Sequence, residues 1–218
     1  NYEKTTTSFN TYHYHDHWHT SLYFIKIMRK IFIITGPIGS GKSSACRFLR
    51  KYDFQYINSD QLAKHIIKND KNIKKKISKL LKLNYELSER IPWKRIRNFI
   101  SMNTNNKKNY NAIIHTIFYN KLNRLISKSK DNFVIEIPLL ETIKEIKYRN
   151  KIICILANEK NRKKRFMKNK GKNELQFNCL NKLQKSKRFY IMNSDYVIHN
   201  DNGIRTMTDK LISIIKSN

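Results

Sequence analysis

Short runs rich in apolar residues alternate along this chain with longer stretches in which apolar residues recur every three or four positions. Runs without regular polar alternation are typical of parallel strands that are buried on both faces. The runs occupy residues 31–34, 54–58, 132–137, 151–156 and 195–199. They predict a five-stranded parallel sheet.

The stretches between these runs predict helices, and hence one α/β domain with a sheet flanked by helices. Helices are expected from Asp60 onward and over residues 42–50, 158–169, 174–193 and 204–215. Residues 70–130 also have helical spacing, but they are too many for a simple crossover. They predict an inserted helical subdomain, with residues 28–69 and 131–218 as the core. Trp93 in this insertion is favoured as a core residue over one that stacks on a base.

Residues 1–27 are polar and aromatic without apolar periodicity, so they are expected to be a disordered leader or extension. Met28 leads directly into the first strand and is a candidate natural start. Four histidines alternate in the leader, at His13, His15, His17 and His19. In an extended chain they would share one face and could hold a metal. Because no second ligand cluster accompanies them, a disordered leader is the favoured interpretation.

The composition is strongly basic, with 45 Lys and Arg against 16 Asp and Glu and a net charge of +29. A charge of this size normally indicates nucleic acid or an anionic surface as partner. Here the basic residues are spread over the whole chain with abundant Asn and Ile, which indicates a compositional bias. No nucleic-acid partner is therefore expected, although a basic nucleic-acid-binding ATPase stays an alternative function.

The three cysteines are isolated, at Cys46, Cys154 and Cys179. They have no C-x-x-C spacing and no nearby histidine, so they indicate neither a zinc site nor a disulfide framework. A reducing, cytoplasmic location is expected for such a protein. No run approaches the roughly 18 apolar residues of a membrane span, so a soluble protein without a membrane partner is expected.

Directly after the first strand, residues 36–43 read GPIGSGKS, a complete match to G-x-x-x-x-G-K-[ST]. Between a strand and a helix, this pattern is typical of a phosphate-binding loop. The glycines let successive backbone N–H groups turn inward toward an anion at the start of the helix. Contacts to the nucleotide are expected from Gly36, Gly39, Ser40, Gly41, Lys42, Ser43 and Ser44.

Two side chains of this loop are predicted to act on the nucleotide itself. Lys42 would contact the β and γ phosphates of ATP as a catalytic cation. The Ser43 hydroxyl would be a ligand of a phosphate-bound Mg²⁺. ATP and Mg²⁺ are therefore the predicted cofactors.

Acidic residues stand at the ends of two later strands. Asp60 follows the second strand, where ligands bind in open α/β sheets. On spacing alone, a plain helix N-cap explains Asp60 equally well. Glu136 and Glu141 bracket the end of the third strand, and either could reach a Mg²⁺ through water. A solvated cap is an equal alternative for these two.

Arg162 and Arg165 lie in the charged stretch 158–169 and face the same way on a helix, because they are three residues apart. A charged helix face is usually solvated. The functional alternative is a lid over about residues 158–185 that closes these arginines over the phosphates.

Four segments of the chain resemble the dephospho-CoA kinases, in the order that this family has them. They are MRKIFIITGPIGSGKSS at 28–44, YINSDQLAKHII at 56–67, EIPLLE at 136–141 and SDYVIHNDNG at 194–203. Gln184 matches a family glutamine eleven residues before Asp195, and Ile114-His115 resembles the family's I-x-H-P. The resemblance runs from Met28 to the C-terminus.

This resemblance implies ATP-dependent phosphorylation of the ribose 3′-hydroxyl of dephospho-CoA, the last step of coenzyme A synthesis. It implies a core of the phosphate-loop NTPase type, a CoA-binding helical region at about 70–130 and a lid. Asp60 matches the family's proposed base, which takes the hydroxyl proton and helps to hold the metal. Arg165 matches the lid arginine, a catalytic residue. Asn200, a predicted nucleotide contact, begins the 200–203 turn that matches the one near the adenine.

Four positions depart from the family pattern: Asn58 stands for an aspartate, Lys64 for an arginine, Thr116 for a proline and Asn169 for a second lid arginine. The aromatic residue of the family's P-L-L-f-E motif is also missing. Because Lys42, Ser43 and Asp60 are kept, the departures are interpreted as drift. Another nucleoside or nucleotide kinase of the same core and an inactive ATP-binding remnant stay alternatives.

Overall fold

The computed structural model describes residues 29–83, 91–138, 140–168 and 172–218. The predictions for residues 1–27, with their four histidines, and for Met28 and Asn169 lie outside these ranges. The side chain of Glu141 is likewise not described. Among the described helices, none has the length and apolar character needed to cross a membrane.

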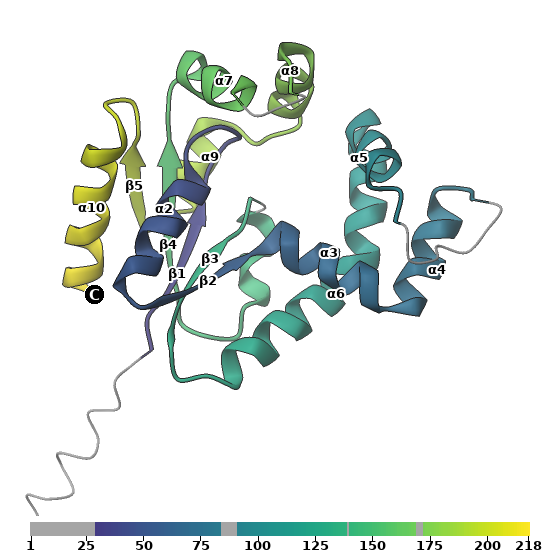
Figure 1. Cartoon of the computed structure of the whole chain (residues 1–218), viewed down its shortest axis with the longest axis horizontal. Coiled ribbons are helices and arrows are strands. Elements are labelled where there is room, and N and C mark those ends of the chain that lie inside the picture. Colours follow the sequence, from purple (N-terminus) through teal and green to yellow (C-terminus); the bar gives the residue numbers. More distant parts are fainter. Residues whose placement is uncertain (1–28, 84–90, 139, 169–171) are drawn as a thin grey trace, which may run out of the picture.

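Five parallel strands form one sheet in the order β2-β3-β1-β4-β5 (Figure 1). Their bounds are Ile31–Thr35 (β1), Phe54–Asn58 (β2), Asn132–Glu136 (β3), Lys151–Leu156 (β4) and Tyr196–His199 (β5). The predicted five-stranded parallel sheet is therefore confirmed. β3 ends one residue earlier than predicted, and β5 begins one residue later, after Asp195.

Helices connect the strands, as the apolar spacing predicted. Their bounds are α2 (Lys42–Leu49), α3 (Ser59–Asn69), α4 (Lys71–Leu80), α5 (Trp93–Met102), α6 (Thr104–Ser127), α7 (Glu159–Met167), α8 (Glu174–Lys182), α9 (Lys187–Met192) and α10 (Ile204–Ser217), with 3-10 turns η1 (Arg50–Tyr52) and η2 (Leu140–Glu145). The single helix predicted over 174–193 is wrong. Ser186 accepts the Phe189 N–H at 3.2 Å and so caps a new helix, α9.

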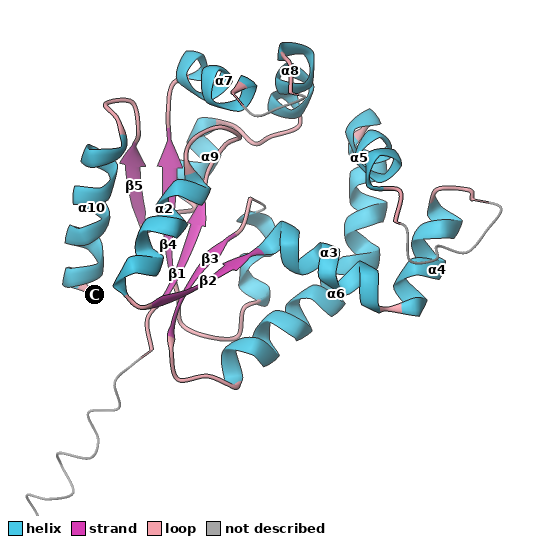
Figure 2. Ribbon diagram, in the orientation of Figure 1, coloured by secondary structure: helices cyan, strands magenta, loops and turns pink. Residues whose placement is uncertain are grey.

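Different helices cover the two faces of the sheet (Figure 2). α2 and α10 pack on one face, in a cluster with Phe32 and Ile34. α6 and α9 pack on the other face, in a cluster with Ile31 and Ile33. Successive residues of β1 therefore point to opposite and equally buried faces, which is why the strand has no polar alternation.

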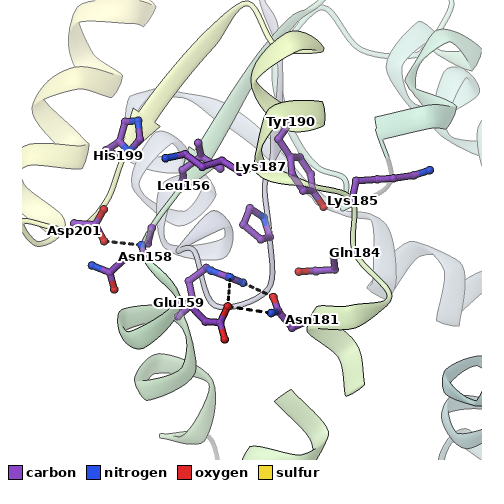
Figure 3. Close-up of a pocket in the computed structure, with 13 residues that line it drawn as sticks. Leu156, Asn158, Glu159, Asn181, Gln184, Lys185, Lys187, Tyr190, His199 and Asp201 are labelled. Carbon is purple, nitrogen blue, oxygen red and sulfur yellow. Dashed lines mark hydrogen bonds and ion pairs between the residues drawn. The ribbon is translucent and has the colours of Figure 1, made fainter. Parts of the chain in front are cut away.

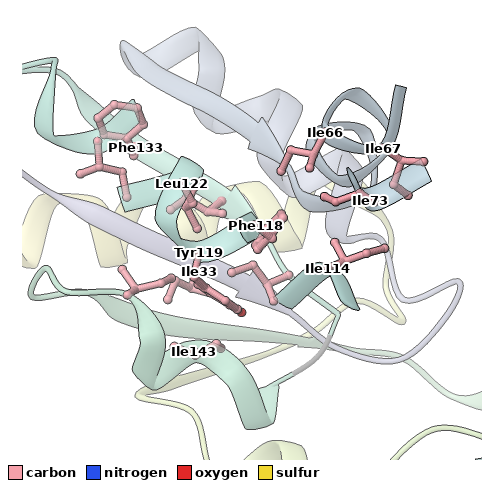
Figure 4. Close-up of a cluster of buried hydrophobic side chains, with 14 of the residues drawn as sticks. Ile33, Ile66, Ile67, Ile73, Ile114, Phe118, Tyr119, Leu122, Phe133 and Ile143 are labelled. Carbon is pink, nitrogen blue, oxygen red and sulfur yellow. The ribbon is translucent and has the colours of Figure 1, made fainter. Parts of the chain in front are cut away.

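The helical insertion forms a lobe beside the sheet (Figure 1). The long helix α6 joins this lobe to the core. Figure 4 shows Ile73 and Phe118 in the same hydrophobic cluster as Leu122, Ile33 and Phe133. The insertion and the sheet therefore share one core, and the lobe is held in a fixed position next to the strand ends.

The strand register brings three chemical groups together at the carboxyl ends of the strands. Glu136, the last residue of β3, is the register partner of both Ile34 in β1 and Asn58 in β2. The loop after β1, the end of β2 and the Glu136 carboxylate therefore meet at the carboxyl ends of the strands, where ligands bind in open α/β sheets.

Candidate active site

The loop after β1 turns tightly because of its glycines. Gly36, Gly39 and Gly41 have φ values of 137°, 75° and 110°. A Cβ at Gly39 would lie 2.3 Å from the backbone oxygen of Arg162, and one at Gly41 would lie 2.4 Å from Asn200 Nδ2. Only glycine permits both the positive φ and this close approach. The loop is thus enclosed by α7 and by the turn after β5.

The loop ends at the start of α2, which has Gly41 as its N-cap and no side-chain cap. The first N–H groups of the helix are therefore open to an anion. Lys42 Nζ donates to the backbone oxygens of Gly36 at 2.9 Å and Pro37 at 3.0 Å. Burial lowers the pKa of Lys42, and the negative charges of Glu136 and Asp60 oppose that effect. A cation and open amides thus lie side by side, as phosphate binding requires.

Ser43 contacts a buried carboxylate. Its Oγ donates to Glu136 Oε1 at 2.8 Å. The other carboxylate oxygen accepts from Asn58 Nδ2 at 2.9 Å and from the Tyr56 hydroxyl. Glu136 is only 7% exposed, so its interpretation as a solvated cap is wrong. Burial, and then the hydrogen bond to Glu136, raise the pKa of Tyr56, which keeps this hydroxyl protonated as a donor.

The oxygens of Ser43 and Glu136 suit a magnesium ion. Mg²⁺ prefers hard oxygen ligands and takes one or two from the protein, with phosphates and waters completing the set. Within the described residues, no group of three or more His, Cys, Asp or Glu side chains could hold a metal ion by itself. The donor set therefore fits a metal that arrives with a nucleotide.

Asp60 is not the N-cap of α3, although its spacing allowed that role. α3 begins at Ser59 and has Asn58 as its N-cap, whose Oδ1 accepts the Gln61 N–H at 3.0 Å. Asp60 lies in the first turn on the wall of a large cavity. Asp60 is exposed as a residue, but desolvation of its carboxyl group by the surrounding protein, and then the nearby charge of Glu136, raise its pKa, while Lys64, Lys42 and Lys172 lower it.

The cavity has a volume of about 970 Å³ and lies between helices α3, α5 and α6 on one side and helices α7, α8 and α9 on the other. It extends from Ile38 of the phosphate loop past Asp60 to Trp93 of α5. Trp93 is half-buried and packs against the core, as favoured from the sequence. It also lines the cavity, and stacking on a base there stays a prediction. The cavity is therefore large enough for a nucleotide-sized acceptor next to the loop.

Two cations and a histidine are positioned on the cavity wall. Lys64 Nζ lies 5.9 Å from the centre of the Trp93 ring, and Lys172, just before α8, also lines the cavity. His115 also lines the cavity, and its Nε2 is buried without a hydrogen-bond partner among the described residues. Lys172 was not predicted, because only the folded chain brings it opposite Asp60.

Arg162 and Arg165 both reach the phosphate loop from α7. Arg162 is buried, and its Nη1 donates to Asn181 Oδ1 at 2.8 Å and to the Ile38 oxygen at 3.3 Å. Arg165 donates to the Asn200 oxygen at 2.7 Å and to the Ser40 oxygen at 3.4 Å. A solvated face is therefore the wrong interpretation for both. In this structure the two guanidinium groups bind backbone oxygens of the loop and its neighbour.

The outer side of the loop is held by two amide side chains. Asn200 is buried and donates from Nδ2 to the Ser40 oxygen at 2.8 Å. Gln184 Oε1 accepts the Ile38 N–H at 2.9 Å. Ser40 is fully buried, and its Oγ has no hydrogen-bond partner in the described part of the chain. Ser44 is half-buried, and its hydroxyl accepts a hydrogen bond from Arg47 at 3.4 Å.

A second, smaller cavity of about 260 Å³ lies at the start of α7, and Figure 3 shows side chains that line it. Glu159, Asn181 and Gln184 border it, and Arg162 lines it as well. The carboxylate of Asp201 is occupied there, because it accepts the Asn158 N–H at 2.8 Å. Glu159, Arg162 and Asn181 bind one another here, which ties α7 to α8.

A family model described as "Dephospho-CoA kinase" matches residues 30–206. The chain belongs to the dephospho-CoA kinase family. A dephospho-CoA kinase from Protochlamydia amoebophila is 25% identical over 190 residues, which are 84% of this chain and 93% of that one. One from Bacillus cereus is 24% identical over 192 residues, covering 84% of this chain and 94% of the relative.

Solved structures share the fold. A dephospho-CoA kinase from Campylobacter jejuni superposes with a TM-score of 0.56 at 21% identity, covering 87% of this chain and 97% of the other. A shikimate kinase from Acinetobacter baumannii, in complex with shikimate, gives a TM-score of 0.54 at 18% identity, covering 87% and 94%. At these identities the likeness concerns the fold, which is that of phosphate-loop kinases.

The departures from the dephospho-CoA kinase pattern fall at different kinds of position. Asn58 is engaged twice, as the cap of α3 and as a donor to Glu136. Lys64 stands on the cavity wall. Thr116 is exposed on α6 and is not one of the residues that line the cavity. Asn58 and Lys64 therefore lie at the candidate site.

Proposed function

We propose that this chain transfers the γ-phosphoryl group of ATP to the ribose 3′-hydroxyl of dephospho-CoA. Its membership of the dephospho-CoA kinase family supports the use of ATP and the choice of acceptor. The observation that carries the proposal is that one continuous cavity runs from Ile38 of the phosphate loop past Asp60 to the helices between β2 and β3. An acceptor in that cavity would have its hydroxyl next to both the loop and a carboxylate.

The phosphate loop would bind the nucleotide. The open N–H groups at the start of α2 and the Lys42 ammonium favour a polyphosphate. Ser40 and Asn200 lie together on the outer side of the loop, where the turn after β5 matches the family's adenine turn. The Arg165 contacts to both residues support a role for Arg165 in shaping the nucleotide side of the site.

Ser43 and Glu136 would hold a Mg²⁺ that accompanies ATP. When bound, this ion would neutralise charge on the β and γ phosphates. The hydrogen bond of 2.8 Å between the two side chains keeps their oxygens adjacent. The prediction that Asp60 also holds the metal stays a prediction, whereas its position on the cavity wall supports contact with the acceptor.

Asp60 would act as the base and orient the attacking hydroxyl. The ribose oxygen forms the new bond to the γ-phosphorus as the bond to the β-phosphate bridging oxygen breaks, and Asp60 takes the hydroxyl proton. ADP leaves with the electron pair of the broken bond. A pKa raised by desolvation and by Glu136 makes Asp60 a stronger proton acceptor than an ordinary aspartate. Positioning and charge neutralisation supply the remaining rate enhancement.

A coupled assay of ADP formation tests the proposal, with dephospho-CoA, adenosine and AMP as separate acceptors. The expected result is turnover with dephospho-CoA and a product heavier by one phosphate. Turnover with adenosine or AMP instead would make the chain another nucleotide kinase. ATP hydrolysis that depends on added RNA or DNA would favour the nucleic-acid ATPase. ATP binding without any turnover would indicate an inactive remnant.

The proposed activity needs no partner beyond its two substrates, and neither a nucleic acid nor a membrane is part of it. Cys46 and Cys154 are buried free thiols, and Cys179 is an exposed one. The cytoplasmic location stays a prediction that these thiols support.

A further inference from the structure

The Glu136 carboxylate is shared between two strands and the phosphate loop. One oxygen, Oε1, accepts from Ser43 at 2.8 Å. The other, Oε2, accepts from Asn58 at 2.9 Å and from the Tyr56 hydroxyl. Asn58 and Tyr56 come from the same strand, and Asn58 is the register partner of Glu136. The two oxygens of Glu136 therefore have separate partners.

Both donors to Oε2 are neutral. A buried carboxylate needs hydrogen bonds to offset its desolvation, and neutral donors supply them without cancelling its charge. The charge of Glu136 therefore remains available on the Ser43 side, close enough to Lys42 to affect its pKa. Together with the Ser43 bond to Oε1, these two bonds to Oε2 hold the carboxylate in one orientation.

The side chain at position 58 thus donates a hydrogen bond to the carboxylate at position 136 without adding a second charge. The Asn58 amide contributes a donor where an aspartate would put a second carboxylate within hydrogen-bond distance of Glu136. Two carboxylates at that distance cannot both ionise without repulsion. The pair Asn58–Glu136 carries one negative charge across the β2–β3 ladder.

We propose that Tyr56 and Asn58 are positioning residues that aim the Glu136 carboxylate at Ser43, and that Asn58 is matched to Glu136. The site then needs one carboxylate across this strand pair, at either position. This inference rests on the proposed function, because it concerns the metal that accompanies ATP. It also changes the interpretation of Asn58, from drift to a compensated exchange.

The test uses Mn²⁺ as the probe. Electron paramagnetic resonance measures its binding to the protein–ADP complex. Glu136→Gln should weaken Mn²⁺ binding about 10- to 100-fold, and the exchanged pair N58D/E136Q should recover most of that loss. Tyr56→Phe should weaken binding by a smaller factor. Asn58→Asp alone should lower the melting temperature of the ligand-free protein, because it opposes two buried carboxylates.

Matched controls lie close by. Gln55→Glu adds one negative charge at an exposed position of β2, and Tyr52→Phe removes the hydroxyl of an exposed tyrosine. Both should leave Mn²⁺ binding and melting temperature unchanged. A fall with Gln55→Glu as large as with Asn58→Asp would assign the effect to net charge and overturn the pairing.

Two further outcomes would overturn the inference: wild-type Mn²⁺ affinity in Glu136→Gln, or an N58D/E136Q protein that binds no better than Glu136→Gln. A failure of the proposed function can be distinguished from a failure of this inference. A wild-type protein that binds Mn²⁺–ADP but does not phosphorylate dephospho-CoA would contradict the function, while the variants would still report on the pairing.

Discussion

Arg165 and Asn200 are joined by a hydrogen bond of 2.7 Å, from the guanidinium Nη2 to the backbone oxygen. The same arginine donates to the Ser40 oxygen, which also accepts the side-chain amide of Asn200. Three segments therefore converge at one point: the phosphate loop, helix α7 and the turn after β5. These bonds hold Arg165 against the loop and the turn after β5.

Arg165→Ala should therefore weaken ATP binding more than it slows catalysis. The loss of two charge-assisted hydrogen bonds would loosen the nucleotide side of the loop, and we expect about a tenfold rise in the ATP dissociation constant. Isothermal titration with a non-hydrolysable ATP analogue measures it. Lys164→Ala, an exposed neighbour on α7, is the control. A large fall in kcat with unchanged affinity would instead support arginine closure over the transferring group.

Asp60→Asn should act in the opposite way. It removes the proton acceptor but keeps the shape and α3, whose cap is Asn58. We expect kcat to fall about 10²- to 10⁴-fold, as for the loss of a general base, with little change in ATP affinity. Steady-state kinetics with dephospho-CoA, beside titration with the ATP analogue, separates the two effects. Gln61→Ala, in the same turn, is the control, and an unchanged kcat would remove Asp60 from the mechanism.

The local part of this site could be predicted from the sequence. The strand before the loop is a run of apolar residues, and the glycine spacing with Lys42 and Ser43 lies within eight consecutive positions. Helical spacing likewise predicted the insertion between β2 and β3. These signals depend on residues that are neighbours in the chain, so they need no knowledge of the register.

The contacts between distant segments could not be predicted. Tyr56 reaches Glu136 only because β2 pairs with β3 in one particular register. The spacing placed Arg162 and Arg165 on one helix face, but it could not tell that their partners are backbone oxygens of the loop. Asp60 could be separated from a capping role only once the start of α3 was known.

Removing Lys64 should shift the acid side of the pH profile. Lys64 and Lys172 on the cavity wall and Lys42 in the loop lower the pKa of Asp60, whereas desolvation and Glu136 raise it. Without the Lys64 charge, the pKa of Asp60 would rise further. Because a base must be deprotonated, the acid limb of kcat/KM should move to higher pH in Lys64→Ala.

The measurement is the pH dependence of kcat/KM for dephospho-CoA. Lys64→Arg keeps the charge and should keep the wild-type profile. Lys68→Ala, an exposed position one turn further along α3, should do the same. An acid limb that stays in place in Lys64→Ala would mean that another group than Asp60 titrates there.

Asp195 offers a test of stability away from the site. Its carboxylate accepts the Ile152 N–H at 2.8 Å and binds Lys151 Nζ at 2.9 Å, which ties the start of β5 to β4. Partial burial raises the pKa of Asp195, but these hydrogen bonds outweigh that effect and lower it overall. A group with a lowered folded-state pKa stabilises the protein above its unfolded pKa, and this contribution is lost as the pH falls through the folded value.

Asp195→Asn should therefore lower the free energy of unfolding by about 1 kcal/mol at pH 7, a modest value because the ion pair is partly exposed. The difference from the wild type should shrink as the pH falls below the unfolded-state pKa of aspartate. Urea unfolding at neutral and acidic pH measures it, with Asp209→Asn on the exposed side of α10 as the control. A difference that stays constant with pH would mean that the lost stability comes from packing at the start of β5 and owes nothing to the charge of Asp195.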